Sequence, residues 1–258
     1  MKLTSPYTRA LTRRPGRSLQ AGLSTAGLGI PDVDLALRQH DRYVAALSDC
    51  GLDVTVLPAD EDYPDAVFVE DTAVIAGGLA VICRPGAPSR RGEEERIAEW
   101  LEPIFQNVVR ISSPGSLEGG DVMRVGRGFY VGLSGRSDER GIAQFREAVA
   151  RFDFEVIPVE LERLLHLKTG VSYLEGGALL VASELVDHAL WRGFEQIVVP
   201  AEEAYAANCV CINDRVLVPS GYPRTRHLLE TAGYQTVELD VSEFRKLDGG
   251  LSCLSIRF

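Results

Sequence analysis

One structural pattern recurs along this chain of 258 residues. Two short apolar segments flank a tight turn, an amphipathic stretch follows, and a further apolar segment ends the unit. In the clearest copy, residues 67–83 predict a hairpin that turns at Gly77-Gly78, residues 91–105 carry apolar side chains at helical spacing, and residues 107–111 predict a strand. The pattern therefore predicts a ββαβ unit.

The same order of elements returns three more times with different turn residues. It predicts hairpins over 121–133, 171–182 and 209–218, helices over 137–152, 188–194 and 225–232, and strands over 154–159, 196–200 and 234–239. In the second unit we expect the Ser137 hydroxyl to cap the helix.

Both ends of the chain contribute to the last unit. Residues 251–256 are predicted to pair with residues 3–11, ahead of a helix over 32–47 and a strand over 52–57. Five units of about 40 to 50 residues fill the chain, a period typical of repeat and propeller folds. We therefore predict an α/β fold, a five-fold pseudo-symmetric α/β propeller of ββαβ units in a single domain over 1–258, with a two-layer open sheet as the alternative.

Composition limits the partners. The chain has 37 acidic and 27 basic residues, a formal charge of −10. This excess argues against nucleic acid or an anionic membrane as the main partner and suits a cationic small molecule, although solubility alone accounts for it equally well.

The cysteines indicate a reducing compartment. There are five, without the spacing of a disulfide framework, so we expect a cytoplasmic protein. Neither a secretory signal nor a run of ~18 apolar residues is found. Cys209 and Cys211 lack a second pair or a nearby His, so we expect no metal site and no cofactor, with metal binding at this pair as a minor alternative.

Four segments carry side chains suited to catalysis. Asp65, Glu70 and Asp71 surround an apolar segment that we predict to be a strand, and Glu118 precedes two glycines. His166 lies between two leucines, and Cys253 follows a Gly-Gly turn on the predicted strand 251–256. Each has a structural explanation on its own, but in a five-fold ring one end of every hairpin points toward the axis, so these side chains are predicted to converge.

A thiol, an imidazole and several carboxylates together indicate nucleophilic catalysis on a planar cation. Carboxylates can hold the N–H groups of a guanidinium while sulfur attacks its central carbon. An ester or amide hydrolase would instead need backbone donors for an oxyanion and few nearby acids.

The chain resembles the dimethylarginine dimethylaminohydrolase family of the amidinotransferase, or pentein, superfamily. Four segments carry the resemblance: Phe68-Val69-Glu70-Asp71, Leu117-Glu118-Gly119-Gly120-Asp121, Leu165-His166-Leu167-Lys168-Thr169-Gly170 and Asp248-Gly249-Gly250-Leu251-Ser252-Cys253. The resemblance implies the pentein fold and hydrolysis of N-omega-methylated arginines to citrulline and dimethylamine or methylamine.

The resemblance also implies roles for individual residues. Cys253 matches the nucleophile that forms a covalent S-alkylthiouronium intermediate, and His166 matches the residue that protonates the departing amine and then activates water. Glu118 matches the carboxylate that orients His166 and the guanidinium. Asp71, with Glu70 beside it, matches acids at the substrate nitrogens.

The remaining matches concern substrate binding. Asp65, Arg90 and Arg136 match residues that hold the amino acid end, and the backbone carbonyls of Leu23 and Leu247 match further substrate contacts. Residues 17–31, which contain Leu23, match a lid that excludes water from the site.

Two other functions stay open at this point. One is that of an arginine deiminase or another guanidine-modifying enzyme of the same superfamily, such as an amidinotransferase. Deiminases resemble the chain in their thiol, His and acids, but they are longer, with an added helical insertion. A non-catalytic propeller that binds a partner would be expected to lack the thiol, the His or Glu118, and all three are present. The sequence leaves a homodimer open.

Overall fold

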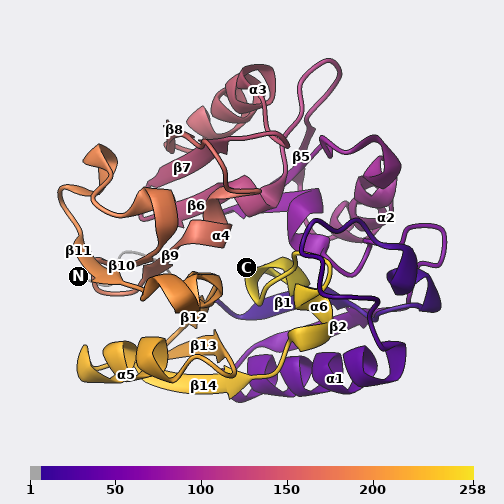
Figure 1. Cartoon of the computed structure of the whole chain (residues 1–258). Helices are drawn as coiled ribbons and strands as arrows, with labels where there is room; N and C mark the ends of the chain where they lie inside the picture. The colour runs from indigo at the N-terminus through magenta and orange to yellow at the C-terminus, as the bar shows by residue number, and fades with distance from the viewer. Residues whose placement is uncertain (1–6) are drawn as a thin grey trace.

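In a computed structural model of the chain, which describes residues 7–258, five three-stranded sheets are arranged around a central axis (Figure 1). Within each sheet the middle strand pairs antiparallel with one neighbour and parallel with the other. The antiparallel pair is a hairpin in four of the sheets, and the parallel strand arrives after a crossover. The predicted five-fold α/β propeller is confirmed.

Helices on the outside of the ring carry most of the crossovers (Figure 1). The first two units contain β3 (Ala73–Ala76), β4 (Leu79–Ile82), α2 (Glu93–Leu101) and β5 (Asn107–Arg110), then β6 (Val122–Val125), β7 (Gly128–Leu133), α3 (Glu139–Ala150) and β8 (Glu155–Glu160). The next two contain β9 (Val171–Leu174), β10 (Ala178–Val181) and β11 (Glu195–Val198), then β12 (Val210–Ile212), β13 (Arg215–Pro219), α5 (Pro223–Thr231) and β14 (Gln235–Leu239).

The two ends of the chain close the ring. β15 (Ile256–Arg257) pairs antiparallel with β1 (Arg9–Arg13), through Ala10 with Arg257 and Leu11 with Ile256. β1 in turn runs parallel to β2 (Asp53–Leu57) after helix α1 (Val33–Asp49). The shared fifth unit is therefore confirmed for residues 7 and beyond, and the predicted pairing of residues 3–6 lies outside the described residues.

Several predicted elements differ from those observed. Residues 67–71 do not form a strand, because the chain turns into the short 3₁₀ helix η2 (Val69–Thr72) before β3. Cys253 likewise lies in a 3₁₀ turn, η8 (Ser252–Leu254), and not on a strand. The crossover between β10 and β11 uses two 3₁₀ turns, η5 (Ser183–Leu185) and η6 (Ala189–Trp191), where a helix was predicted.

The cap of helix α3 lies one residue later than predicted. It is Asp138, whose carboxylate accepts the N–H of Gly141 at 2.8 Å. A carboxylate at this position also interacts favourably with the positive end of the helix dipole. The Ser137 hydroxyl instead donates to Asp121 at 2.6 Å and accepts the Glu118 N–H at 3.0 Å, so it serves the interior of the ring.

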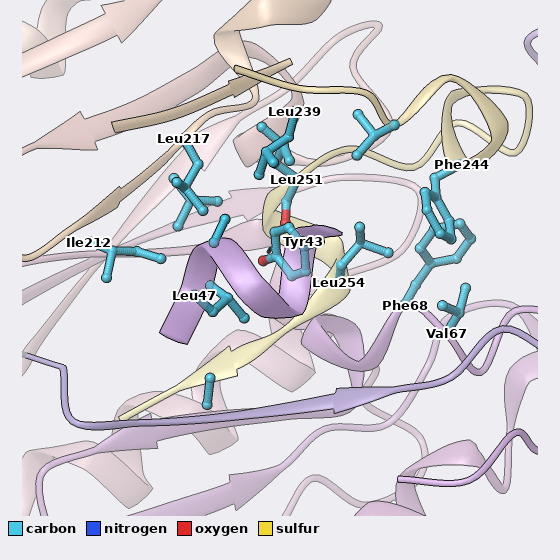
Figure 2. Close-up of a cluster of buried hydrophobic side chains, with 14 of the residues drawn as sticks. Tyr43, Leu47, Val67, Phe68, Ile212, Leu217, Leu239, Phe244, Leu251 and Leu254 are labelled. Carbon is cyan, nitrogen blue, oxygen red and sulfur yellow. Dashed lines mark hydrogen bonds between the residues drawn. The ribbon is translucent and has the colours of Figure 1, made fainter. Parts of the chain in front are cut away.

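The core beside the C-terminal segment holds the turn η8 in place. Tyr43, on the buried face of α1, lies among Leu47, Leu251 and Leu254 (Figure 2). Its hydroxyl contacts the carbonyl of Leu251 at 2.9 Å and the hydroxyl of Ser255 at 2.7 Å. A segment near a chain terminus frays unless it is tied down, and these contacts tie it to the buried face of α1.

No helix among residues 7–258 is both long enough and apolar enough to cross a bilayer.

Candidate active site

Eight of the ten predicted site residues line one cavity of about 170 Å³. They come from segments far apart in the sequence: Leu23, Asp65, Asp71, Arg90, Arg136, His166, Leu247 and Cys253. The two exceptions are Glu118, which is buried directly behind His166, and Glu70, which lines a different and larger cavity. The convergence expected from the ring is present.

The Cys253 thiol lies in an environment that opposes its ionisation. The residue is half-buried, and its sulfur accepts the backbone N–H of Gly250 at 3.4 Å. Burial, then the charges of Glu70 and Asp71, raise the pKa of the thiol to about 12, although Gly250 and the Lys168 ammonium act in the opposite direction. The thiol is therefore protonated at neutral pH in the absence of a bound cation.

His166 and Glu118 form a buried pair. The Nε2 atom of His166 lies 2.6 Å from a Glu118 oxygen, and Glu118 is inaccessible to solvent. Burial disfavours the imidazolium, but the carboxylates of Asp71, Asp121 and Glu118 outweigh it and raise the pKa of His166 above its usual value. Burial also disfavours ionised Glu118, yet its hydrogen bond to His166 and the nearby cations lower its pKa. The pair is thus an imidazolium and a carboxylate at neutral pH.

Gly120 allows the backbone to lie close to this pair. Gly119 and Gly120 belong to the 3₁₀ turn η4 (Gly119–Asp121), just after Glu118. A Cβ on Gly120 would lie 2.7 Å from an Asp71 oxygen and 2.8 Å from His166 Nδ1, closer than Cβ contacts allow. Because glycine has no Cβ, the backbone can come this close to both side chains.

Asp121 supports His166 from behind, a role that the sequence reasoning did not assign. One of its oxygens accepts the N–H of Leu167, the residue after His166, at 2.9 Å. The other accepts the hydroxyls of Ser134 and Ser137 at 2.7 and 2.6 Å. The sequence contains a signal for this role, because Asp121 ends the same motif that contains Glu118, Leu117-Glu118-Gly119-Gly120-Asp121.

Arg90 is buried among carboxylates. Its guanidinium lies 2.7 Å from Asp71, 2.8 Å from Glu93 and 3.9 Å from Glu118. Arg136, the second predicted arginine, approaches Glu118 at 3.5 Å and remains partly exposed. Two cations therefore balance the acids of the site before any ligand is bound. Glu93 was missed, although an Arg followed three residues later by an acid at a helix start is a visible signal.

The segment 17–31 covers the cavity. The N–H of Leu23 donates to both oxygens of Asp65 at 3.0 and 3.2 Å. Farther along, the Ser24 hydroxyl donates to the carbonyl of Lys246, and the N–H of Thr25 donates to Asp248, each at 2.5 Å. The predicted lid is closed, and it is held to the segment that precedes Cys253.

Three potential metal ligands gather at one place in the described part of the chain. Atoms of Asp71, Glu118 and His166 lie within 4.8 Å of one another, and neither Cys209 nor Cys211 belongs to this group. The guanidinium of Arg90 already contacts both carboxylates of the group. These carboxylates already have a cationic partner, and we assign no metal to the group.

Comparison with known proteins identifies the family. The family model "N,N dimethylarginine dimethylhydrolase, eukaryotic" matches residues 32–188. The chain is 46% identical to the N(G),N(G)-dimethylarginine dimethylaminohydrolase of Pseudomonas aeruginosa over 253 residues, which are 98% of this chain and 100% of that protein. The chain belongs to the dimethylarginine dimethylaminohydrolase family.

Solved structures of dimethylarginine dimethylaminohydrolases share the fold, and the first described is from Pseudomonas aeruginosa. A Cys-to-Ser variant complexed with citrulline matches with a TM-score of 0.97 and 45% identity over 98% of this chain and 100% of that one. A His-to-Gly variant in an adduct with S-methyl-L-thiocitrulline matches with a TM-score of 0.96 and 46% identity over the same shares. Dimethylarginine dimethylaminohydrolases thus resemble this chain throughout the ring.

Proposed function

We propose that this protein hydrolyses N-omega-methylated arginines to citrulline and dimethylamine or methylamine, with Cys253 as nucleophile. One observation carries the proposal: the thiol, the His166–Glu118 pair and the carboxylate of Asp71 meet at a single lid-covered cavity. Membership of the dimethylarginine dimethylaminohydrolase family supports the same activity.

The substrate's charge starts the reaction. The guanidinium binds beside the Asp71 carboxylate, with the buried Glu118 behind His166, while Arg90 and Arg136 limit the repulsion between the two carboxylates. The bound cation stabilises the thiolate of Cys253, so the thiol releases its proton to the solvent as the substrate binds, since His166 is already protonated. Asp65, Arg136 and the carbonyls of Leu23 and Leu247 hold the amino acid end.

Two covalent steps follow. The sulfur of Cys253 attacks the central guanidinium carbon, and His166 donates a proton to the methylated nitrogen, which leaves as the neutral amine when its bond to carbon breaks. His166, now neutral, accepts a proton from water as the water oxygen attacks the same carbon of the S-alkylthiouronium. The carbon–sulfur bond then breaks, so citrulline and the free thiol are released.

Glu118 keeps His166 ready for the first of these steps. Its hydrogen bond holds the ring in place and favours the protonated form, which is the form needed to protonate the leaving amine. The closed lid limits the water that reaches the thiouronium before the amine departs.

Incubation with asymmetric dimethylarginine tests the proposal, with citrulline and dimethylamine measured separately. Cys253→Ser should abolish turnover and leave ligand binding largely intact, because the groups that hold the substrate are elsewhere. An arginine deiminase would release ammonia from arginine as its preferred reaction. That result would replace the proposed substrate.

We further propose a cytoplasmic location, since none of the five cysteines is paired in a disulfide. A homodimer is likewise a proposal, and size measurement in solution tests it.

A further inference from the structure

A second cavity of about 470 Å³ lies at the axis of the ring, lined in every sheet by residues of the strand that pairs antiparallel with the middle strand. It does not communicate with the active-site cavity through any shared residue of the described chain. Adjacent residues face opposite ways: Glu70 and Ser252 line the axial cavity, whereas Asp71 and Cys253 line the active site. A layer of side chains therefore forms the back wall of the active site.

Glu70 is the centre of this layer. One oxygen lies 2.6 Å from the Lys168 ammonium and 2.8 Å from the Arg257 guanidinium. The other accepts the hydroxyl of Ser252 at 2.7 Å. The side chain is buried, and these three contacts direct its carboxylate away from the substrate cavity, where the sequence predicted it to bind substrate nitrogens.

Arg257 holds the turn that carries Cys253. Its Nη1 atom donates to the carbonyl of Ser252 at 3.2 Å, to the carbonyl of Ser255 at 3.1 Å and to the Ser255 hydroxyl at 2.7 Å. These acceptors lie on both sides of Cys253 in the sequence. The guanidinium has a planar set of donors that can serve several acceptors at once, which an ammonium cannot reproduce.

We propose that Arg257 and Glu70 are positioning residues for the Cys253 thiol: Arg257 clamps the backbone on both sides of the nucleophile, and Glu70 anchors that clamp to Ser252 and Lys168. This role rests on the proposed function of Cys253. The closure of the ring then contributes to the active site, because β15 carries Arg257 and pairs with β1.

The charge of Glu70 acts on the thiol, and Arg257 carries the opposite charge and pairs with Glu70. Glu70 raises the pKa of Cys253, whereas the Lys168 ammonium, held by Glu70, lowers it. Removal of the Glu70 charge should therefore make the thiol more acidic. Removal of Arg257 leaves Glu70 less neutralised and should make the thiol less acidic. A merely structural loosening would move both variants in the same direction.

Alkylation of Cys253 by neutral iodoacetamide measures the thiol without any substrate. The rate is followed against pH by mass spectrometry of the C-terminal peptide in Glu70→Gln, Arg257→Met and Arg257→Lys. We expect about tenfold faster alkylation in Glu70→Gln and several-fold slower alkylation in Arg257→Met, since one pKa unit changes the thiolate fraction about tenfold. Arg257→Lys should fall between Arg257→Met and the wild type.

The kinetics of dimethylarginine turnover give a second, independent measurement of the positioning role. We expect kcat to fall about tenfold or more in Arg257→Met, with KM changed less than about twofold, because the substrate contacts are on other elements. Arg13→Met is the matched control: Arg13 is buried, lies on the adjacent strand β1 and donates to the carbonyl of Pro58. It should leave both kcat and alkylation unchanged.

Three outcomes would overturn the proposal: equal shifts of alkylation in Glu70→Gln and Arg257→Met, an equal effect in Arg13→Met, or a rise in KM without a fall in kcat for Glu70→Gln. The last would restore Glu70 to substrate binding. If alkylation shifts as expected but dimethylarginine is not turned over, the clamp stands and the proposed function fails.

Discussion

The Cys253 thiol should be protonated in the free protein and should ionise when a guanidinium binds beside it. Its pKa of about 12, against an ordinary value of 9.0, arises from burial and from the carboxylates of Glu70 and Asp71. The difference corresponds to about 4 kcal/mol. At neutral pH the thiolate fraction is then on the order of 10⁻⁵, too small for rapid attack on carbon.

A bound guanidinium contributes an opposing term of similar size. A unit positive charge ~4 Å from the sulfur, at an effective dielectric constant of ~20, stabilises the thiolate by about 4 kcal/mol. The pKa of the thiol would return to near its ordinary value. Substrate binding therefore raises the thiolate fraction by roughly a thousandfold.

Ultraviolet absorbance of the thiolate measures this directly, as the difference between the wild type and Cys253→Ser over a pH titration. We expect no step near neutral pH in the free protein, and a step that moves toward neutral pH when an unreactive amidine or guanidinium is added. Citrulline is the matched control, because it has nearly the same shape without the charge. Full thiolate absorbance at pH ~7 without ligand, or an equal response to citrulline, would refute the reasoning.

The remaining predictions concern packing, acid stability and capping. Gly120→Ala should lower kcat at least about tenfold, because the added Cβ would lie 2.8 Å from His166 Nδ1. Gly193→Ala is the control, because no atom lies within 4 Å of the position of its Cβ, and it should leave kcat unchanged. Equal activity of the two variants would contradict the packing argument. His40 is fully buried without a partner for either ring nitrogen, and burial lowers its pKa to about 4, so only the unfolded chain takes up a proton there between the usual value of 6.5 and 4. Acidification from pH 6.5 to 4 should therefore lower the free energy of unfolding, measured in urea, by about 3 kcal/mol. His40→Leu should remove this loss. An unchanged dependence of the free energy of unfolding on pH in the variant would exclude His40 as the cause. Asp138→Ala should cost about 1 kcal/mol by loss of the α3 cap, and Asp138→Asn should recover most of it in thermal unfolding, whereas equal losses would indicate that the side-chain acceptor is unimportant.

The order of elements could be predicted because it depends on local signals. Gly77 in the hairpin between β3 and β4 adopts a φ of +62°, and Asn213 in the hairpin between β12 and β13 adopts +56°, conformations that these residue types tolerate and most others do not. The amphipathic spacing of α1 similarly predicts a helix with one buried face. Such signals need no knowledge of the partner that covers them.

Local signals failed where tertiary contacts decide the backbone. Residues 251–256 have the composition of a strand, yet the contacts of Tyr43, Asn208 and Arg257 hold Ser252 to Leu254 in a 3₁₀ turn. Tyr43 and Asn208 are far away from this segment in the sequence. No window of residues around Cys253 contains that information.

The sequence by itself determined the repeat, the closure of the ring by both termini and the residue types that carry the chemistry, because these follow from local patterning and from long motifs. Only the tertiary structure decided which way each side chain faces. Glu70 and Asp71 are neighbours in the sequence, but a 3₁₀ turn sends one carboxylate to the axial cavity and the other to the active site. Charge partners from other units select that orientation, since a buried carboxylate is stable only where cations or donors meet it.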